Sequence, residues 1–217
     1  MLLDAVEWLG HAGFRVDTGD VTVYIDPYRV HDGPGADLIL ITHGHYDHFS
    51  PLAIERLAHP GTRLIAPPAV AERIGGNVRS IREGETIEHG EGLEITALPA
   101  YNTSKVDADG RPFHAREAGG VGYELRIGAE RLYHSGDTDV IEEMDRVAGV
   151  DVALLPVSGT YVMTAGEAAE AARRIAPKVA VPMHWGAQIG TRADAEEFAR
   201  MSAVRVEILE PQPADAE

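Results

Sequence analysis

The pattern of apolar and polar residues predicts an alternating series of short strands and helices along the chain. Apolar and β-prone runs bounded by turn residues indicate strands, and apolar residues three or four positions apart indicate helices. Strands are predicted at 5–9, 13–17, 21–25, 37–41, 64–66, 93–98, 121–127, 131–134, 152–155, 179–182 and 204–209, and helices at 51–58, 69–74, 140–147, 165–175 and 193–201. This alternation is typical of an α/β protein.

Two segments differ from the rest of this pattern. Residues 37–41 form a continuous apolar run, which is typical of a strand covered on both faces. This strand leads directly into a histidine-rich loop. Residues 99–119 show no clear periodicity, and an irregular segment of that length within a compact domain is often functional.

The two halves of the chain share a faint repeat. A Gly-aromatic pair, a turn glycine and a tyrosine follow one another at 13–24 and again at 122–133. Two hairpins could share turn glycines by chance. If the repeat is real, the domain consists of two α/β halves whose sheets pack face to face with helices outside.

Composition narrows the possible functions. The chain has 217 residues, which fits one domain, and its formal net charge of -16 disfavours a nucleic-acid substrate because no basic run offsets it. The absence of cysteine excludes disulfides, Cys-based metal sites and a thiol nucleophile. The N-terminus has no signal-peptide pattern, and no apolar stretch approaches the roughly 20 residues of a membrane span. We therefore expect a cytoplasmic protein without membrane contact.

The strongest chemical signal is the run His43-x-His45-x-Asp47-His48. In a chain without cysteine, a metal must be bound by imidazole and carboxylate groups. His43 and His45 point the same way in an extended segment, so they can bind one ion together. Asp47 and His48 lie where the chain turns toward the next helix, and they can face a second ion. A surface loop would carry this spacing by chance only rarely, so the run predicts a metal site.

Two further metal ligands are predicted at the ends of other strands. Asp137 follows the strand at 131–134, and His184 follows the strand at 179–182. Open α/β sheets gather ligands at the carboxyl ends of their strands, so these side chains should meet the histidine run. Asp137 is placed to bridge two ions, and His184 to complete the second. Each would be a weak signal alone, since Asp after Gly is usually a turn former.

Together these residues resemble the metallo-β-lactamase superfamily of hydrolases. The His-x-His-x-Asp-His motif of that family stands at 43–48, its bridging Asp resembles Asp137, and its last ligand resembles His184. The resemblance implies one metallo-β-lactamase-like domain over residues 1–217, an αββα four-layer sandwich of two packed mixed β-sheets with outer helices. Three segments are similar to the branch related to ascorbate-6-phosphate lactonase: 8–12, 26–28 and 133–138.

One ligand of the family pattern is missing. The family has a histidine after the strand that here is 93–98, where this chain reads Pro-Ala-Tyr-Asn-Thr at 99–103. His114 in the irregular loop could take its place, the first ion could be weakly held or absent, or Asn102 could replace the histidine. A neutral amide oxygen binds zinc weakly. The expected cofactor is therefore one or two divalent ions, zinc first, with manganese, iron or nickel as alternatives.

The resemblance implies hydrolysis by a metal-bound hydroxide, while a metal polarises the carbonyl or phosphoryl oxygen of the substrate. Asp47 would orient the attacking water and accept its proton. His11 could donate a proton to the leaving group or bind substrate, and His134 could support the site, although either could equally be a structural histidine. An anionic group of the substrate could be held by basic residues of the irregular loop, namely Lys105, Arg111 and Arg116.

The expected partner is thus a small-molecule lactone, ester, amide or phosphodiester. A nuclease or phosphodiesterase of the same superfamily is the second interpretation, although so short a chain has little room for a substrate-clamping segment. A non-catalytic metal-binding protein with a decayed site is the third, supported by the missing histidine. The sequence leaves substrate, metal and homo-oligomerisation open.

Overall fold

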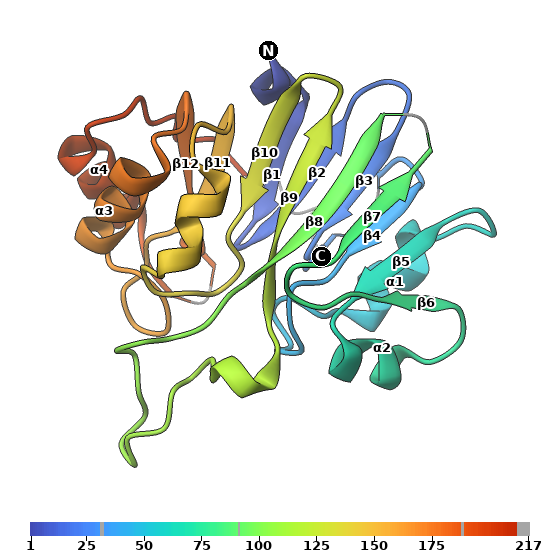
Figure 1. Ribbon diagram of the computed structural model, residues 1–217, viewed down its shortest axis with the longest axis horizontal. Helices are drawn as coiled ribbons and strands as arrows, with labels where there is room; N and C mark the ends of the chain where they lie inside the picture. The colour runs from blue at the N-terminus through green and yellow to red at the C-terminus, as the bar shows by residue number, and fades with distance from the viewer. Residues whose placement is uncertain (31–32, 91, 188, 212–217) are drawn as a thin grey trace.

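Two six-stranded sheets pack face to face in the computed structural model, which describes residues 1–30, 33–90, 92–187 and 189–211. The helices of the first half lie to one side of the paired sheets and those of the second half to the other (Figure 1). Each sheet contains both parallel and antiparallel neighbours. The predicted α/β architecture with two packed mixed sheets is therefore confirmed.

The first sheet has the strand order β1-β2-β3-β4-β5-β6. The first three strands are antiparallel and the later ones parallel. Helix α1 (Pro51–Leu57) begins at Ser50, whose side chain accepts a hydrogen bond from the backbone N–H of Ala53, and helix α2 (Pro68–Ile74) follows β5. The strands are β1 (Val6–Gly10), β2 (Gly13–Asp17), β3 (Thr22–Ile25), β4 (Leu38–Leu40), β5 (Arg63–Ala66) and β6 (Val78–Ser80).

The second sheet has the order β12-β11-β10-β9-β8-β7. Strands β7 to β10 are antiparallel, and β10, β11 and β12 run parallel. The strands are β7 (Thr86–His89), β8 (Leu93–Pro99), β9 (Val121–Ile127), β10 (Glu130–His134), β11 (Val152–Pro156) and β12 (Val179–Met183). The helices are α3 (Ala165–Ile175) and α4 (Arg192–Met201), with short 3-10 turns η1 (Leu2–Ala5), η2 (Arg116–Ala118) and η3 (Glu142–Val147).

Strand β4 is buried on both faces, as its continuous apolar run predicts. Leu38 and Leu40 belong to the large core between the sheets. Ile39 and Ile41 belong to a second core that the first sheet forms with α1 and α2. This double burial fixes the end of β4, from which the histidine-rich loop departs.

The two sheets share one topology, which favours a real repeat over a chance match of turn glycines. In each, an antiparallel hairpin, β2–β3 or β9–β10, continues into parallel strands. Gly13 and Gly122 take equivalent places in these hairpins. A Cβ atom at Gly13 would lie 3.0 Å from the carbonyl oxygen of Asp26, and one at Gly122 would lie 2.6 Å from that of His134. Both halves thus need a glycine where the hairpin strands approach closely.

The sequence pattern missed β6 and β7 and overstated one strand. Both missed strands lie at sheet edges and bury no residue fully, so their hydrophobic pattern is weak. The expected strand 204–209 is reduced to a bridge between Ala180 and Val206. Pro182, two residues further along β12, has no N–H with which to extend that ladder. The helix expected at 140–147 is instead the 3-10 turn η3.

Within the described residues, no helix is both long and apolar enough to cross a membrane.

Replacing Gly122 by Ala should destabilise the fold, because the new methyl group would contact two backbone carbonyl oxygens, of His134 and Ser135, that cannot move aside. We expect a loss on the order of 1–3 kcal/mol and a fall in Tm of several degrees in thermal unfolding. Gly166→Ala in α3 is the matched control, since its methyl group would meet only the flexible end of Met201. It should keep or raise Tm through better helix propensity. Equal losses in both variants would contradict this account.

Candidate metal centre

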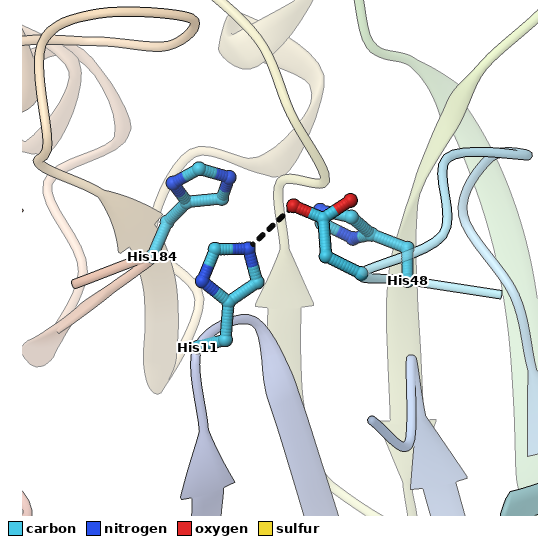
Figure 2. Close-up of side chains that lie close together, drawn as sticks. His11, His48 and His184 are labelled. Carbon is cyan, nitrogen blue, oxygen red and sulfur yellow. Dashed lines mark hydrogen bonds and ion pairs between the residues drawn. The ribbon is translucent and has the colours of Figure 1, made fainter. Parts of the chain in front are cut away.

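Loops from both sheets converge at one site and carry the predicted ligands. The loop after β4 carries residues 43–48, the loop after β10 carries Asp137, and His184 directly follows β12. His11 lies in the turn between β1 and β2. Figure 2 shows His11, His48 and His184 gathered at the ends of strands. Parallel strands end at the same edge of a sheet, so residues far apart in sequence meet there.

The first cluster consists of His43, His45 and His114. The Nδ1 atom of His45 lies 3.1 Å from Nε2 of His43 and 3.2 Å from Nε2 of His114. Oδ2 of Asp137 lies 3.3 Å from Nε2 of His114 and 4.0 Å from Nε2 of His43. Three imidazoles with one carboxylate oxygen are a donor set that suits a divalent ion such as zinc.

The second cluster consists of Asp47, His48 and His184, with His11 against it. Each of these four side chains offers a ligand atom, and those atoms all lie within 4.8 Å of one another. Asp137 Oδ2 lies 3.1 Å from Nε2 of His184, and Asp137 Oδ1 lies 3.3 Å from Nε2 of His48. Asp137 therefore faces both clusters, as a bridging ligand would.

Four of the histidines are held through Nδ1, so that Nε2 points into the site. The partners are Thr42 for His43 (3.0 Å), Asp26 for His48 (2.7 Å), Asn102 for His114 (3.1 Å) and Ser158 for His184 (2.9 Å). Metal-binding histidines commonly have their second nitrogen bonded in this way, which fixes the ring orientation. The arrangement therefore suits a metal site.

Asp26 is the most constrained of these partners. It is fully buried, has a left-handed backbone φ of 46°, and accepts hydrogen bonds from the backbone N–H and the hydroxyl of Thr42 as well as pairing with His48. From the sequence, Asp26 stood out only as part of a segment similar to the family. Its position directly after the predicted strand 21–25 was the signal for a site residue.

Unpartnered buried atoms test whether a metal fits. His48 Nε2 and Asp137 Oδ1 are buried and have no hydrogen-bond partner among the described residues, although they lie 3.3 Å apart. A buried polar atom without a partner costs about 1–3 kcal/mol. A divalent ion between these atoms would satisfy both, so the residues present fit a metal.

The charges of the site also suit a cation. Burial lowers the pKa of His43 well below its usual value. Burial by itself would raise the pKa of Asp137, but the imidazoles of His184 and His48 hold it well below its ordinary range. Burial likewise opposes charge on His48, yet Asp137 and Asp26 raise its pKa well above the usual value. A neutral His43 and an ionised Asp137 are the forms that bind metal, whereas His48 must release a proton first.

The structure brings His114, rather than Asn102, to His43 and His45. The side-chain oxygen of Asn102 instead accepts a hydrogen bond from the backbone N–H of His114 at 2.8 Å and lies 3.1 Å from its Nδ1. Its amide group donates to the carbonyl oxygen of Tyr161 at 2.9 Å. Asn102 thus occupies the region of the missing family histidine but orients the histidine supplied by the loop.

The two predicted catalytic histidines have different surroundings. Nε2 of His11 lies 3.0 Å from Oδ2 of Asp47, within the cluster. Nε2 of His134 instead lies 2.9 Å from the carbonyl oxygen of Ala12, and its Nδ1 accepts the N–H of Gly136. With both nitrogens bonded to backbone, His134 supports the loop that carries Asp137 and does not face the cluster.

The basic residues proposed to hold an anion are paired elsewhere. Lys105 contacts Glu167 at 2.7 Å, and Arg116 contacts Glu143 at 2.6 Å. Arg111 is exposed and pairs with Asp109. A cavity of about 270 Å³ beside the first cluster is lined by a different cation, Arg73, for which the sequence pattern gave no signal.

Comparison with known proteins is consistent with this geometry. The family profile described as "Beta-lactamase superfamily domain" matches residues 5–184. A UPF0173 metal-dependent hydrolase of Methanopyrus kandleri is 38% identical in an alignment that covers 95% of this chain and 96% of that protein. A protein of the same name from Methanosarcina mazei is 33% identical, with 93% and 92% covered. These names give no substrate, and the narrower likeness to ascorbate-6-phosphate lactonase is not confirmed.

Solved structures show the same fold. Igni18, a metallo hydrolase from Ignicoccus hospitalis, aligns with a TM-score of 0.77 and 25% identity over 95% of this chain and 94% of its own. A crystal structure from Parabacteroides distasonis aligns with a TM-score of 0.82 and 32% identity, covering 95% and 93% of the two chains.

Asp139 should control the order of the loop that carries His114. Its Oδ2 atom accepts the backbone N–H groups of Thr103 at 2.8 Å and Ser104 at 2.7 Å. In Asp139→Ala, amide hydrogen exchange across residues 102–106 should quicken by about 10- to 100-fold, because bonds to a charged acceptor are lost. Asp109→Ala, which removes only an exposed carboxylate of the same loop, should leave this exchange unchanged. Unchanged exchange in Asp139→Ala would show that the loop is held by other contacts.

Proposed function

The chain belongs to the beta-lactamase superfamily and is a metal-dependent hydrolase, and on this basis we propose that it binds two divalent ions side by side and hydrolyses a small molecule between them. The observation that carries the proposal is Asp137, whose two carboxylate oxygens face Nε2 atoms of both clusters at 3.1–3.3 Å. A carboxylate in that position can bridge two ions.

The proposed ligands divide into two sets that share Asp137. His43, His45 and His114 would hold the first ion. Asp47, His48 and His184 would hold the second. We propose zinc as the ion, because imidazole and carboxylate donors without thiolate suit it, with manganese, iron or nickel as the alternatives that metal analysis would separate.

The ions would supply a polarised substrate oxygen and a water of lowered pKa. The chain supplies the proton relay beside them. Burial by itself would raise the pKa of Asp47, but the hydrogen bond from His11 lowers it to about 2, so this carboxylate is ionised and can orient water. His11 Nε2, 3.0 Å from Asp47 Oδ2, is placed to pass a proton toward a leaving group.

The volume of the cavity and the net charge of the protein support a small substrate. The cavity of about 270 Å³ lies just below the usual 300–1,000 Å³ of small-molecule pockets. The net charge of -16 and the engagement of Lys105 and Arg116 in ion pairs do not favour the nuclease interpretation. We propose a lactone, ester, amide or small phosphodiester as substrate, and the cytoplasm as location.

Removing ligands should lower metal content and activity together. The wild-type protein should bind two ions, His45→Ala and His114→Ala should bind about one, and Asp137→Ala should bind fewer still. Hydrolysis of a panel of ester, lactone and phosphodiester substrates should fall at least about a hundredfold in each variant, and chelation should abolish it reversibly. Elemental analysis of the purified proteins measures the metal.

His59→Ala is the matched control, because His59 is exposed and belongs to neither cluster. It should retain both ions and full activity. Two tightly bound ions in His114→Ala would remove the loop histidine from the ligand set, and full activity in Asp137→Ala would overturn the two-ion proposal.

Asn102→Ala should weaken the first ion without removing a ligand. Loss of the amide frees the ring of His114 to rotate, and partners of this kind typically contribute about 10- to 100-fold to metal affinity. Competition with a chromophoric chelator measures the two affinities separately, and only the affinity assigned to the first ion should change. Asn77→Ala, on an exposed turn, is the control. An unaltered titration in Asn102→Ala would mean that His114 is positioned by the loop backbone alone.

A further inference from the structure

The cavity beside the first cluster has one apolar side and one chemically reactive side. His43, His45, His114 and Asp137 line the reactive side. The remaining walls include Val70, Phe113 and Val121, together with several alanines and a proline. A molecule in this cavity would place a polar group at the metal ligands and an apolar body against these walls.

Arg73 adds a cation to the lining of this cavity. Its Nη1 atom donates a hydrogen bond to the carbonyl oxygen of Gly44 at 2.6 Å, and the guanidinium lies 4.8 Å from the ring centroid of Phe49. These contacts hold it beside the backbone between His43 and His45. Gly44 provides the room, since a Cβ atom there would come 2.5 Å from Nη1.

Arg73 differs from most cations of this acidic chain in having no carboxylate partner among the described residues. Arg116 and Arg131, for example, contact glutamates at 2.6 and 2.5 Å. A guanidinium has five N–H donors, and the bond to Gly44 uses one. Arg73 is exposed to solvent, so the other N–H groups of its guanidinium can donate hydrogen bonds to a ligand.

We propose that Arg73 binds a carboxylate of the substrate. The substrate would then be a small molecule with a hydrolysable bond at the metal ligands, a short apolar body in the cavity and a terminal carboxylate on the guanidinium. A single planar guanidinium matches a carboxylate, which it can bind through two parallel hydrogen bonds. This assignment rests on the proposed hydrolase function and names its substrate class.

A pair of esters that differ only in charge tests the assignment. The substrates are the mono-para-nitrophenyl ester of glutaric acid and the same ester with its free carboxylate methylated. Arg73→Gln should raise KM for the charged ester by about three- to tenfold, since an exposed charge pair of this kind contributes modestly, and should leave KM for the neutral ester unchanged. The kcat values and the metal content should not change, and Arg73→Lys should lie between wild type and Arg73→Gln.

Arg79→Gln is the matched control, because it removes the same charge from an exposed position outside the cavity. It should leave both KM values unchanged. Equal changes for the two esters in Arg73→Gln, or equal effects in Arg79→Gln, would overturn the assignment. Tighter binding of an ester that ends in phosphate than of the carboxylate ester would overturn the choice of carboxylate.

A binding measurement separates this assignment from the hydrolase proposal. Calorimetric titration of glutaric acid monoanilide into zinc-loaded protein, and into protein stripped with a chelator, should show affinity that Arg73→Gln lowers in both states. Arg73-dependent binding without hydrolysis of any ester would count against the proposed function alone. Hydrolysis with affinity that does not depend on Arg73 would overturn the carboxylate assignment alone.

Discussion

A buried carboxylate surrounded by imidazoles is the constraint on which the rest of the structure depends. Asp137 is only 3% exposed, and an isolated charge at that depth would be strongly unfavourable. Three imidazole nitrogens within 3.3 Å compensate it, and they arrive from the first sheet, the second sheet and the irregular loop. The strand ends and buried partners such as Asp26 therefore all serve to position the side chains around this carboxylate. They hold the carboxylate of Asp137 and the surrounding imidazoles close together, although these groups lose their hydration there.

The fold and the motif could be predicted because their causes are local. Period and run length located the buried strands, and the spacing of His43, His45, Asp47 and His48 depends only on neighbouring residues. The contribution of His114 was not decidable from sequence, because the loop has no periodicity and is hydrogen-bonded to Asp139, more than twenty residues further along the chain. Arg73 was missed for a related reason, since α2 meets the histidine loop only in three dimensions.

The site combines rigid and adjustable parts. His48 and His184 follow buried strands and are anchored by Asp26 and Ser158, so their positions are fixed by the core. His114 is anchored through Asn102 to a surface loop, and Arg73 rests on a helix of only two turns. The second proposed ion would thus be held largely by groups anchored in the core, while one ligand of the first ion and the cation proposed to bind substrate lie on segments that can vary without disturbing the sheets.

The repeated topology places the candidate metal centre between the two halves of the chain. His43, His45, Asp47, His48 and His11 all come from the first half of the chain, whereas His114, Asp137 and His184 come from the second. Each of the two clusters therefore combines residues of both halves, and neither is complete within one half. Two further contacts join the halves at the same place. The N–H of His184 donates a hydrogen bond to the carbonyl oxygen of His11, and Trp8 contacts Trp185. Bound ions would cross-link the two halves there. The same metal–ligand bonds would then stabilise the fold and support the chemistry of the protein.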